Sequence, residues 1–325
     1  MSLDGKRVFV AGATGLAGSA ILRCLLERAP GIRIRAACNN TVPFLLDERI
    51  EYIQLDLTSP EACRNALADC DAAVMAAART SGAGVLTTQP WQQVNTNLVM
   101  NATFLQALAE AHVKRLVLVG SASLYQDFEG YIREDQLDLN QDPPDAYLGI
   151  GWVTRYVEKL CAFWHRQAGL DIVMVRASNI FGPYSRFNPQ TSNFIPALIR
   201  KAVEHLDPFE VWGSPDVTRD VIYADDFARA VVMMLEREDI RFDVFNIGSG
   251  VKTTVGEVVG WSLKAAGHVP SRIVYNDTRP TTVPFRALDC SKARELLGWT
   301  PHYSVEQGIE QTIAWWNDNK DRWTK

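Results

Sequence analysis

The sequence predicts an α/β protein, built on a doubly wound parallel sheet with a smaller C-terminal domain that binds substrate. Three observations predict this fold class. Short apolar segments alternate with segments of helical periodicity over the first 180 residues. A run of three glycines directly follows the first apolar segment and precedes a helical one. After residue 180 the alternation gives way to irregular, polar sequence.

The elements are expected in the following order. The first strand is expected at 6–11, and further strands at 32–37, 52–55, 72–77, 115–119 and 172–176. Helical patterns cover 60–69, 91–112 and 150–168. We expect a dinucleotide-binding domain over 1–180, with later elements near 220–247, and a mainly substrate-binding domain over 181–325. Ligands of such sheets bind beyond the carboxyl ends of the strands, so the informative residues should follow the strands.

The glycines form a G-x-x-G-x-x-G turn between the first strand and the first helix. Gly12 permits the tight turn, Gly15 lets a pyrophosphate approach the backbone, and Gly18 lets helix and strand pack closely. The phosphates would then lie on the N-terminal amides of the helix. We therefore predict a Rossmann-type dinucleotide site, and the alternative is a structural turn that binds no ligand.

Composition excludes several classes of function. The net charge is −5 and no basic run occurs, so we expect no nucleic-acid partner. No apolar stretch approaches the about 20 residues of a membrane span, and no signal peptide is evident, so we expect a cytoplasmic protein with no membrane partner. The six cysteines lack C-x-x-C spacing, so we expect reduced thiols. The five histidines are scattered without metal-ligand spacing, so we expect no metal site.

Further motifs lie at or directly after the third to sixth predicted strands. They are Asp56-Leu57, Ala76–Ala78, Gly120–Tyr125 and Arg176–Pro183, and another motif, Arg219–Asp226, comes later in the chain. With these motifs, nearly the whole chain resembles the extended short-chain dehydrogenase/reductase family, the NAD(P)-dependent epimerases, dehydratases and reductases of nucleotide sugars. Within that family, segments 120–125, 187–198 and 211–214 are most similar to the members that resemble GDP-fucose synthase.

The resemblance implies a role for each motif. The cofactor would contact Gly12, Thr14, Gly15, Leu16, Gly18, Asp56, Leu57, Ala76, Ala77 and Ala78. Ser121 would be the catalytic hydroxyl, which hydrogen-bonds the reacting sugar oxygen. The nucleotide-sugar substrate would contact Ser123, Asn179, Asn193, Arg219 and Arg286. Arginine suits a diphosphate because its donors form a fixed fork, although a surface salt bridge is the alternative for Arg219 and Arg286.

The catalytic pair of the family, Tyr-x-x-x-Lys on a helix, is degraded in this chain. The spacing of four places both groups on one helix face, where the lysine lowers the pKa of the tyrosine. Counting from Tyr147, the lysine position is Gly151; counting back from Glu158, the pair becomes Ile150 and Thr154. Neither alignment gives the pair, so Tyr147 is the best remaining proton carrier.

Two further family positions have lost their acid/base groups. The cysteine and histidine that epimerise carbons 3 and 5 in the fucose-synthase-like members fall at Ser123 and Asn193, and neither residue is an acid/base near pH 7. This favours hydride transfer at carbon 4 alone, as in a 4-epimerase or a 4-keto reductase. The alternatives are a catalytically impaired pseudoenzyme that still binds cofactor and nucleotide sugar, or positions altered from a natural sequence.

The sequence after the second strand bears on the choice of cofactor. An acidic residue there binds the ribose of NAD, and an arginine accommodates the 2′-phosphate of NADP. Residues 36–40 offer neither, while Arg33 and Arg35 lie early on the strand. The absence of an acid favours NADP slightly over NAD.

Helices 91–112 and 150–168 resemble those that pair family members into homodimers. Candidate contacts are Ala102, Leu105, Leu108, Leu160 and Phe163. The alternative is that these side chains cover the sheet.

Overall fold

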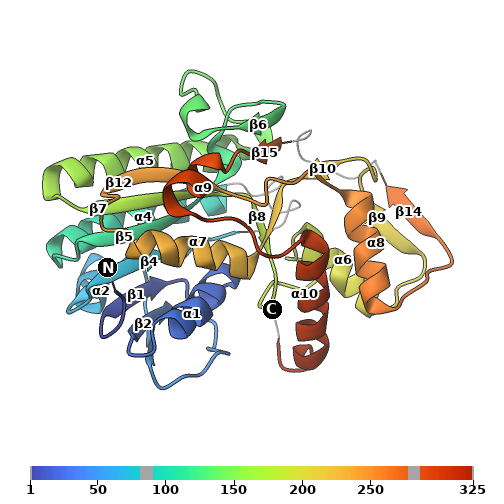
Figure 1. Ribbon diagram of the computed structural model, residues 1–325, viewed down its shortest axis with the longest axis horizontal. Helices are drawn as coiled ribbons and strands as arrows, with labels where there is room; N and C mark the ends of the chain where they lie inside the picture. Colours follow the sequence, from blue (N-terminus) through green and yellow to red (C-terminus); the bar gives the residue numbers. More distant parts are fainter. Residues whose placement is uncertain (1, 81–90, 277–285, 324–325) are drawn as a thin grey trace.

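A parallel sheet organises the first three quarters of the chain in the computed structural model, which describes residues 2–80, 91–276 and 286–323 (Figure 1). In these residues the sheet has seven strands in the order β12-β7-β5-β4-β1-β2-β3, and every neighbouring pair is parallel. The order reverses between β1 and β4, so the predicted doubly wound sheet is confirmed. The strands are β1 (Arg7–Ala11), β2 (Arg33–Cys38), β3 (Ile50–Gln54), β4 (Ala72–Met75), β5 (Arg115–Ser121), β7 (Asp171–Ala177) and β12 (Phe242–Ile247).

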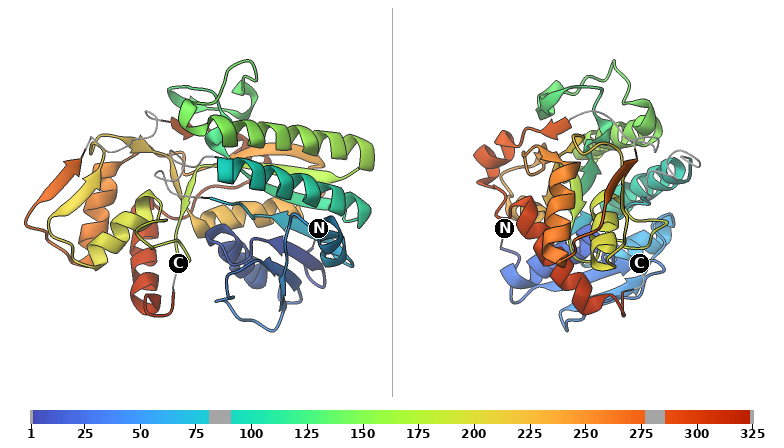
Figure 2. Two further views of the ribbon diagram at one scale, coloured as in Figure 1. Left: turned by 180° about the vertical axis from the view of Figure 1, so that it is seen from behind. Right: turned by 90° about the vertical axis from the view of Figure 1, so that its right-hand side faces the viewer.

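Helices cover both faces of this sheet (Figure 2). On one face α1 (Leu16–Arg28) packs beside α7 (Ala224–Glu236) over a core that includes Ile21 and Phe227. On the other, α2 (Pro60–Leu67), α4 (Trp91–Glu110) and α5 (Leu148–Ala168) lie over a core that includes Phe104 and Val157. Because α5 begins at Leu148, two residues before the predicted start, Tyr147 stands directly at its N-terminus.

Two of the candidate dimer contacts cover the sheet instead of facing outward, as the alternative interpretation predicted. Leu105 and Leu108 are fully buried in the core beneath α4. Phe163 on α5 is half exposed, and Ala102 and Leu160 are partly buried. The inward face of α4 is therefore used within the chain itself.

The second lobe is formed by α6 (Phe194–Val203), α8 (Val255–Ala266) and α10 (Val305–Asn319). They enclose a core with the parallel pair β9 (Phe209–Trp212) and β14 (Ile273–Asn276). Phe187 stacks on Trp316 of α10 with ring centroids 4.0 Å apart. Segment 277–285, part of the Pro-, Asn- and Asp-rich sequence, lies outside the described residues.

Short strands connect the two lobes. β8 (Asn179–Phe181) pairs with β11 (Val221–Tyr223), β10 (Thr218–Arg219) with β13 (Thr253–Thr254), and β15 (Arg286–Leu288) with β6 (Gly130–Ile132). A short helix, α9 (Ser291–Leu297), follows β15. No helix within the described part of the chain has the length and apolarity needed to cross a bilayer.

Candidate active site

The glycine loop after β1 is packed too tightly for side chains. Gly12 has a φ of 76°, and a Cβ there would lie 2.7 Å from the backbone of Ala77, which follows β4. A Cβ on Gly18 would overlap the carbonyl of Gly12, because α1 approaches β1 closely at this point. The loop therefore depends on glycine for both backbone conformation and space.

The first turn of α1 offers its amides to an anion. Its N-cap residue is Gly15, which has no side chain to cap the helix, and no acidic residue lies in the first turn. Ser19 Oγ donates to the carbonyl of Ala13 at 3.2 Å and braces the loop. Thr14 and Leu16, the other predicted contacts here, are partly buried. Unpaired amides at a helix N-terminus suit a dinucleotide diphosphate, so these residues fit NAD(P).

The residues expected near the adenine follow β3 and β4. Asp56 is exposed, and its carboxylate accepts hydrogen bonds from the amide and hydroxyl of Thr58 at 2.9 and 2.7 Å, which lower its pKa. Leu57 instead is buried in the core under α2. Ala76, Ala77 and Ala78 run beside the glycine loop, where the amide of Ala76 donates to the carbonyl of Ala11.

Neither arginine of β2 lies where a 2′-phosphate would bind. Arg33 begins the strand, and its side chain donates to the carbonyl of Gly5. Arg35 forms an ion pair with Glu51 at 3.0 Å and also donates to the carbonyls of Ala66 and Ala68 at the end of α2. The exposed Asn39 and Asn40 follow the strand instead.

A cavity of about 150 Å³ opens at the carboxyl ends of β5 and β7. It brings together six of the predicted residues, Ser121, Ser123, Tyr147, Asn179, Arg219 and Arg286. Asn193 is not among its lining residues: it is exposed at the N-cap of α6. The cavity is also lined by Ala122, Ala177, Ser178 and Asp220, which lie within the motifs named above, and by Phe128, Thr218, Ala287 and Leu288, which the sequence did not single out.

Tyr147 and Arg219 form the polar centre of this cavity. Burial lowers the pKa of the Arg219 guanidinium, and the nearby Tyr147 hydroxyl acts in the opposite direction. Arg286 forms an ion pair with the exposed Asp127, the surface salt bridge considered for it, but it also lines the cavity and lies 5.0 Å from the ring of Phe128. Two guanidinium groups thus face one small cavity.

The two serines differ in their bonding. Ser121 is exposed at the end of β5, and its Oγ accepts a hydrogen bond from the amide of Ser123 at 3.2 Å. Ser123 Oγ is buried and has no hydrogen-bond partner within the described residues. A buried, unpaired hydroxyl at a cavity wall is a natural contact for a polar ligand.

The lysine position that is counted from Tyr147 has no room for a side chain unless its neighbours shift. A Cβ on Gly151 would lie 2.6 Å from Pro143 Cγ and 2.7 Å from the carbonyl oxygen of Ser123. Thr154, by contrast, lies beside Gly120 at the carboxyl end of β5. The helix face that looks toward the strand end therefore carries Ile150 and Thr154, and neither is a cation.

A buried ionic network anchors α5 to the sheet. Arg176 of β7 forms two hydrogen bonds with Glu158 of α5, at 2.9 and 2.8 Å, and donates to the Tyr125 hydroxyl at 2.8 Å. Tyr125 in turn donates to Asn246 Oδ1 of β12 at 2.7 Å, and burial raises the pKa of Tyr125 to about 12. The network holds the helix that presents Tyr147.

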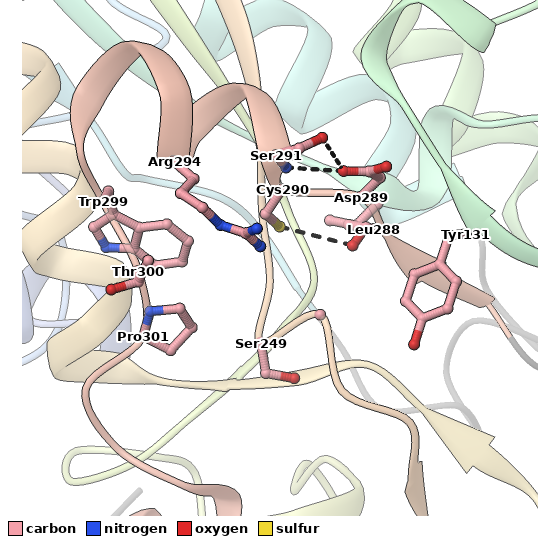
Figure 3. Close-up of a pocket in the computed structure, with 11 residues that line it drawn as sticks. Tyr131, Ser249, Leu288, Asp289, Cys290, Ser291, Arg294, Trp299, Thr300 and Pro301 are labelled. Carbon is pink, nitrogen blue, oxygen red and sulfur yellow. Dashed lines mark hydrogen bonds between the residues drawn. The ribbon is translucent and has the colours of Figure 1, made fainter.

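A second, larger cavity of about 340 Å³ lies on the outer side of β15 (Figure 3). Arg294 of α9, Trp299 and Ser249 face it, and Leu288 lines both cavities. Its lining includes none of Ser121, Tyr147 and Arg219, which all line the smaller cavity, so we place the chemistry in the smaller cavity.

Known proteins are similar to this chain in sequence and in fold. A model of the NAD dependent epimerase/dehydratase family matches residues 8–248. A GDP-L-fucose synthase of Sinorhizobium fredii (strain NBRC 101917 / NGR234) is 30% identical over 318 residues, which cover 95% of each chain.

Two solved structures show the same architecture. MoeE5 in complex with UDP-glucose and NAD is 26% identical, with a TM-score of 0.83 over 97% of this chain and 99% of that one. The UDP-glucose 4-epimerase of Thermotoga maritima is 21% identical and superposes with a TM-score of 0.85 over 97% of this chain and 99% of its own.

Proposed function

The chain belongs to the NAD dependent epimerase/dehydratase family, and from this premise we propose that it transfers hydride at carbon 4 of a nucleotide-linked hexose. The reaction is a 4-keto reduction or a 4-epimerisation. One observation carries the proposal: Ser121, Tyr147 and two arginines line one cavity at the carboxyl ends of β5 and β7. Its relatives include GDP-L-fucose synthases and UDP-sugar epimerases, which are named for nucleotide-sugar substrates.

Each residue has a separate task in this proposal. The nicotinamide cofactor supplies or accepts the hydride when bound. The amides of the first turn of α1 hold its diphosphate. Ser121 Oγ hydrogen-bonds the reacting sugar oxygen, and the Tyr147 hydroxyl exchanges a proton with it. Arg219 and Arg286 hold the diphosphate of the substrate.

Arg219 takes the electrostatic part of the missing lysine. The guanidinium of Arg219 and the hydroxyl of Tyr147 line the same cavity and interact electrostatically. One arginine would therefore both bind the substrate and place a positive charge beside the proton carrier.

We propose NADP as the cofactor, with NAD as the second choice. The absence of an acidic residue directly after β2 supports this preference, because no carboxylate there would repel a 2′-phosphate. MoeE5, which was solved with NAD, supports the second choice.

A pseudoenzyme that binds the same ligands is the second candidate function. The replacement of the family's Tyr-x-x-x-Lys pair by Ile150 and Thr154 favours it, as does the closed packing around Gly151. Both candidates use the same cavity and cofactor loop, so turnover alone separates them.

We further propose a cytoplasmic homodimer. Large apolar side chains on the outer faces of α4 and α5 are exposed, among them Val99, Tyr156 and Phe163. Such a patch is a candidate interface. No disulfide joins the six cysteines, all of which lie in the described part of the chain, and this suits a reducing compartment. Sedimentation that shows only a monomer would remove the dimer from the proposal.

Cofactor titration followed by a redox assay tests the proposal. The purified protein is titrated calorimetrically with NAD, NADH, NADP and NADPH, and nicotinamide absorbance is then followed with UDP-, GDP- and dTDP-hexoses and their 4-keto forms. Selective cofactor binding with a redox change for one sugar supports the enzyme. Cofactor and sugar binding without a redox change supports the pseudoenzyme, and no binding of either overturns both.

A further inference from the structure

Asp220 is a buried carboxylate that joins three separate segments behind the substrate cavity. It follows β10 and is 3% exposed. One carboxylate oxygen, Oδ1, accepts hydrogen bonds from the amide and the hydroxyl of Ser249, at 3.0 and 3.1 Å. The other, Oδ2, accepts from the amide of Leu288 at 3.0 Å. A Cβ on Gly248 would overlap this carboxylate, so the loop after β12 closes tightly over it.

The joined segments carry the substrate-facing polar groups. Arg219 directly precedes Asp220, and Leu288 ends the three-residue strand that begins with Arg286. The main-chain carbonyl of Asp220 also accepts from the amide and the side chain of Asn179, at 3.3 and 3.0 Å. All three side chains line the cavity, and Asp220 is the residue that their segments share.

We propose that Asp220 is a positioning residue that sets the separation of Arg219 and Arg286, and with it the affinity of the cavity for a nucleoside diphosphate. This inference rests on the proposed function, which assigns the diphosphate to those two arginines. Asp220 also lines the cavity, but in this proposal it acts through the backbone of the strands on which the arginines stand.

The chemistry requires a carboxylate at this position. Three donors converge on Asp220, two on one oxygen and one on the other, and a carboxylate accepts at both. An amide has one acceptor oxygen, so its NH₂ group would face a donor either at Ser249 or at Leu288. Burying a carboxylate is costly, and burial raises the pKa of Asp220 to about 6.

Asp220 also stands in the wall between the two cavities. Ser249 and Leu288, the residues it binds, both line the cavity beside α9 (Figure 3). Loss of the carboxylate would therefore release Leu288 of β15 and Ser249, which line the second cavity as well.

The test compares Asp220→Asn with a matched control, Asp226→Asn. Asp226 is equally buried, at 1% exposed, and its carboxylate accepts from the amides of His302 and Tyr303 at 2.7 and 2.9 Å. Its partners lie away from the substrate cavity. Calorimetry would measure the affinity of each variant for UDP, GDP and dTDP and for NAD(H) and NADP(H), with the thermal unfolding midpoint measured alongside.

We expect Asp220→Asn to weaken the tightest nucleoside diphosphate by about tenfold or more, as for loss of a hydrogen bond to a charged group, with dinucleotide affinity unchanged. Asp226→Asn should lower the unfolding midpoint and leave both affinities unchanged. Equal nucleotide affinity in wild type and Asp220→Asn, or the same loss in both variants, overturns the inference. A wild-type protein that binds dinucleotide but no nucleoside diphosphate overturns the proposed substrate and the inference together.

A milder variant covers the case in which Asp220→Asn does not fold. Ser249→Ala removes the hydroxyl bond to Asp220 and leaves the amide bond in place. It should weaken the same nucleoside diphosphate by about threefold, the effect of one ordinary hydrogen bond. No change in that affinity overturns the inference.

Discussion

The glycine loop after β1 and the start of α5 lie at the same edge of the sheet, but the first offers backbone groups to a ligand and the second offers side chains. The loop binds through backbone amides and needs only that Gly12 and Gly18 carry no side chain. The start of α5 should act through side chains, and its lysine position, counted from Tyr147, is taken by Gly151. A site made of backbone survives sequence change as long as its glycines remain, whereas a site made of side chains changes with single residues.

The packing around α5 shows that the rest of the chain accommodates the glycine at position 151. Pro143 and the carbonyl of Ser123 occupy the space that a side chain at Gly151 would need. The predictions below test whether the glycine loop and the start of α5 differ in function as they differ in the groups that they present.

The largest effect is expected at the one proton carrier that α5 retains. Tyr147→Phe removes the hydroxyl without changing the shape of the cavity, so kcat should fall by about a hundredfold or more, the usual effect of losing a general acid/base. The measurement is steady-state turnover of the nucleotide sugar that gives a redox change. Tyr156→Phe, an exposed tyrosine on the same helix, is the control and should be silent.

Unchanged turnover in Tyr147→Phe would contradict the view that α5 acts through the Tyr147 side chain, because chemistry would then proceed without the tyrosine. Loss of turnover in both tyrosine variants would point instead to damage of the helix.

The next effect concerns the glycine loop. Gly12→Ala places a side chain at a φ of 76° and into the backbone of Ala77, so the free energy of unfolding should fall by about 3 kcal/mol, the sum of strain and overpacking. Gly5→Ala is matched, with a φ of 74° but nothing within 4 Å, and should cost only about 1 kcal/mol.

Denaturant unfolding measures both glycine variants, and calorimetry with NADPH shows whether cofactor affinity falls in Gly12→Ala alone. Equal costs for the two variants would mean that crowding against β4 contributes nothing, and the loop would be less demanding than its geometry indicates.

A pair of lysine variants sharpens the comparison within α5. Gly151→Lys should lower the free energy of unfolding by about 1–3 kcal/mol, because its Cβ meets Pro143 and Ser123. Thr154→Lys, beside Gly120 at the strand end, has a partly exposed position and should leave stability nearly unchanged. Chemical unfolding of the two variants decides the matter; a well-tolerated Gly151→Lys would mean that the helix start shifts easily.

The smallest effect is a pH dependence of substrate binding. As pH falls from 7 to 5, Asp220 gains a proton near its pKa of about 6, so affinity for a nucleotide hexose should fall by up to about tenfold. The sign for stability is the opposite. The folded pKa is raised, so between about pH 6 and 4 the folded chain binds a proton that the unfolded chain does not, and this group favours folding as pH falls.

Calorimetry across that range, with thermal unfolding in parallel, separates the two effects. Two other acidic groups lie near: Asp127, which pairs with Arg286, and Glu134, whose pKa burial raises. Cys290 also faces Asp220, but burial raises the pKa of its thiol far above this range. A pH step that persists in Asp220→Asn would assign it to one of the other groups.

Much of the fold could be predicted from the sequence because its signals are local. The strand that precedes Gly12 and the helix that follows it are adjacent in the chain, and the order of apolar segments determined the doubly wound sheet. Ser121 was found through a motif at the end of a predicted strand, and Arg219 through a motif that the family resemblance supplied. The short strands β6, β8, β10 and β15 were missed, since two or three residues carry no periodicity.

What could not be predicted depends on contacts between distant segments. Asn193 is exposed on α6, a position set by the path of the chain after Gly182, which no motif describes. Asp220 was visible as the residue after Arg219, but its role required knowing that Ser249 and Leu288 converge on it. The packing of Gly151 against Pro143 likewise joins the helix to a loop that composition does not place.

The position of β12 has a consequence for synthesis of the protein. This edge strand, made of residues 242–247, is the sole partner of the outer edge of β7 among the described strands. Until residue 247 has left the ribosome, the apolar strand from Ile172 to Val175 has an unpaired edge, the kind of surface that recruits other chains. The first 180 residues therefore cannot complete their sheet during translation, and a fragment that ends there would aggregate rather than fold.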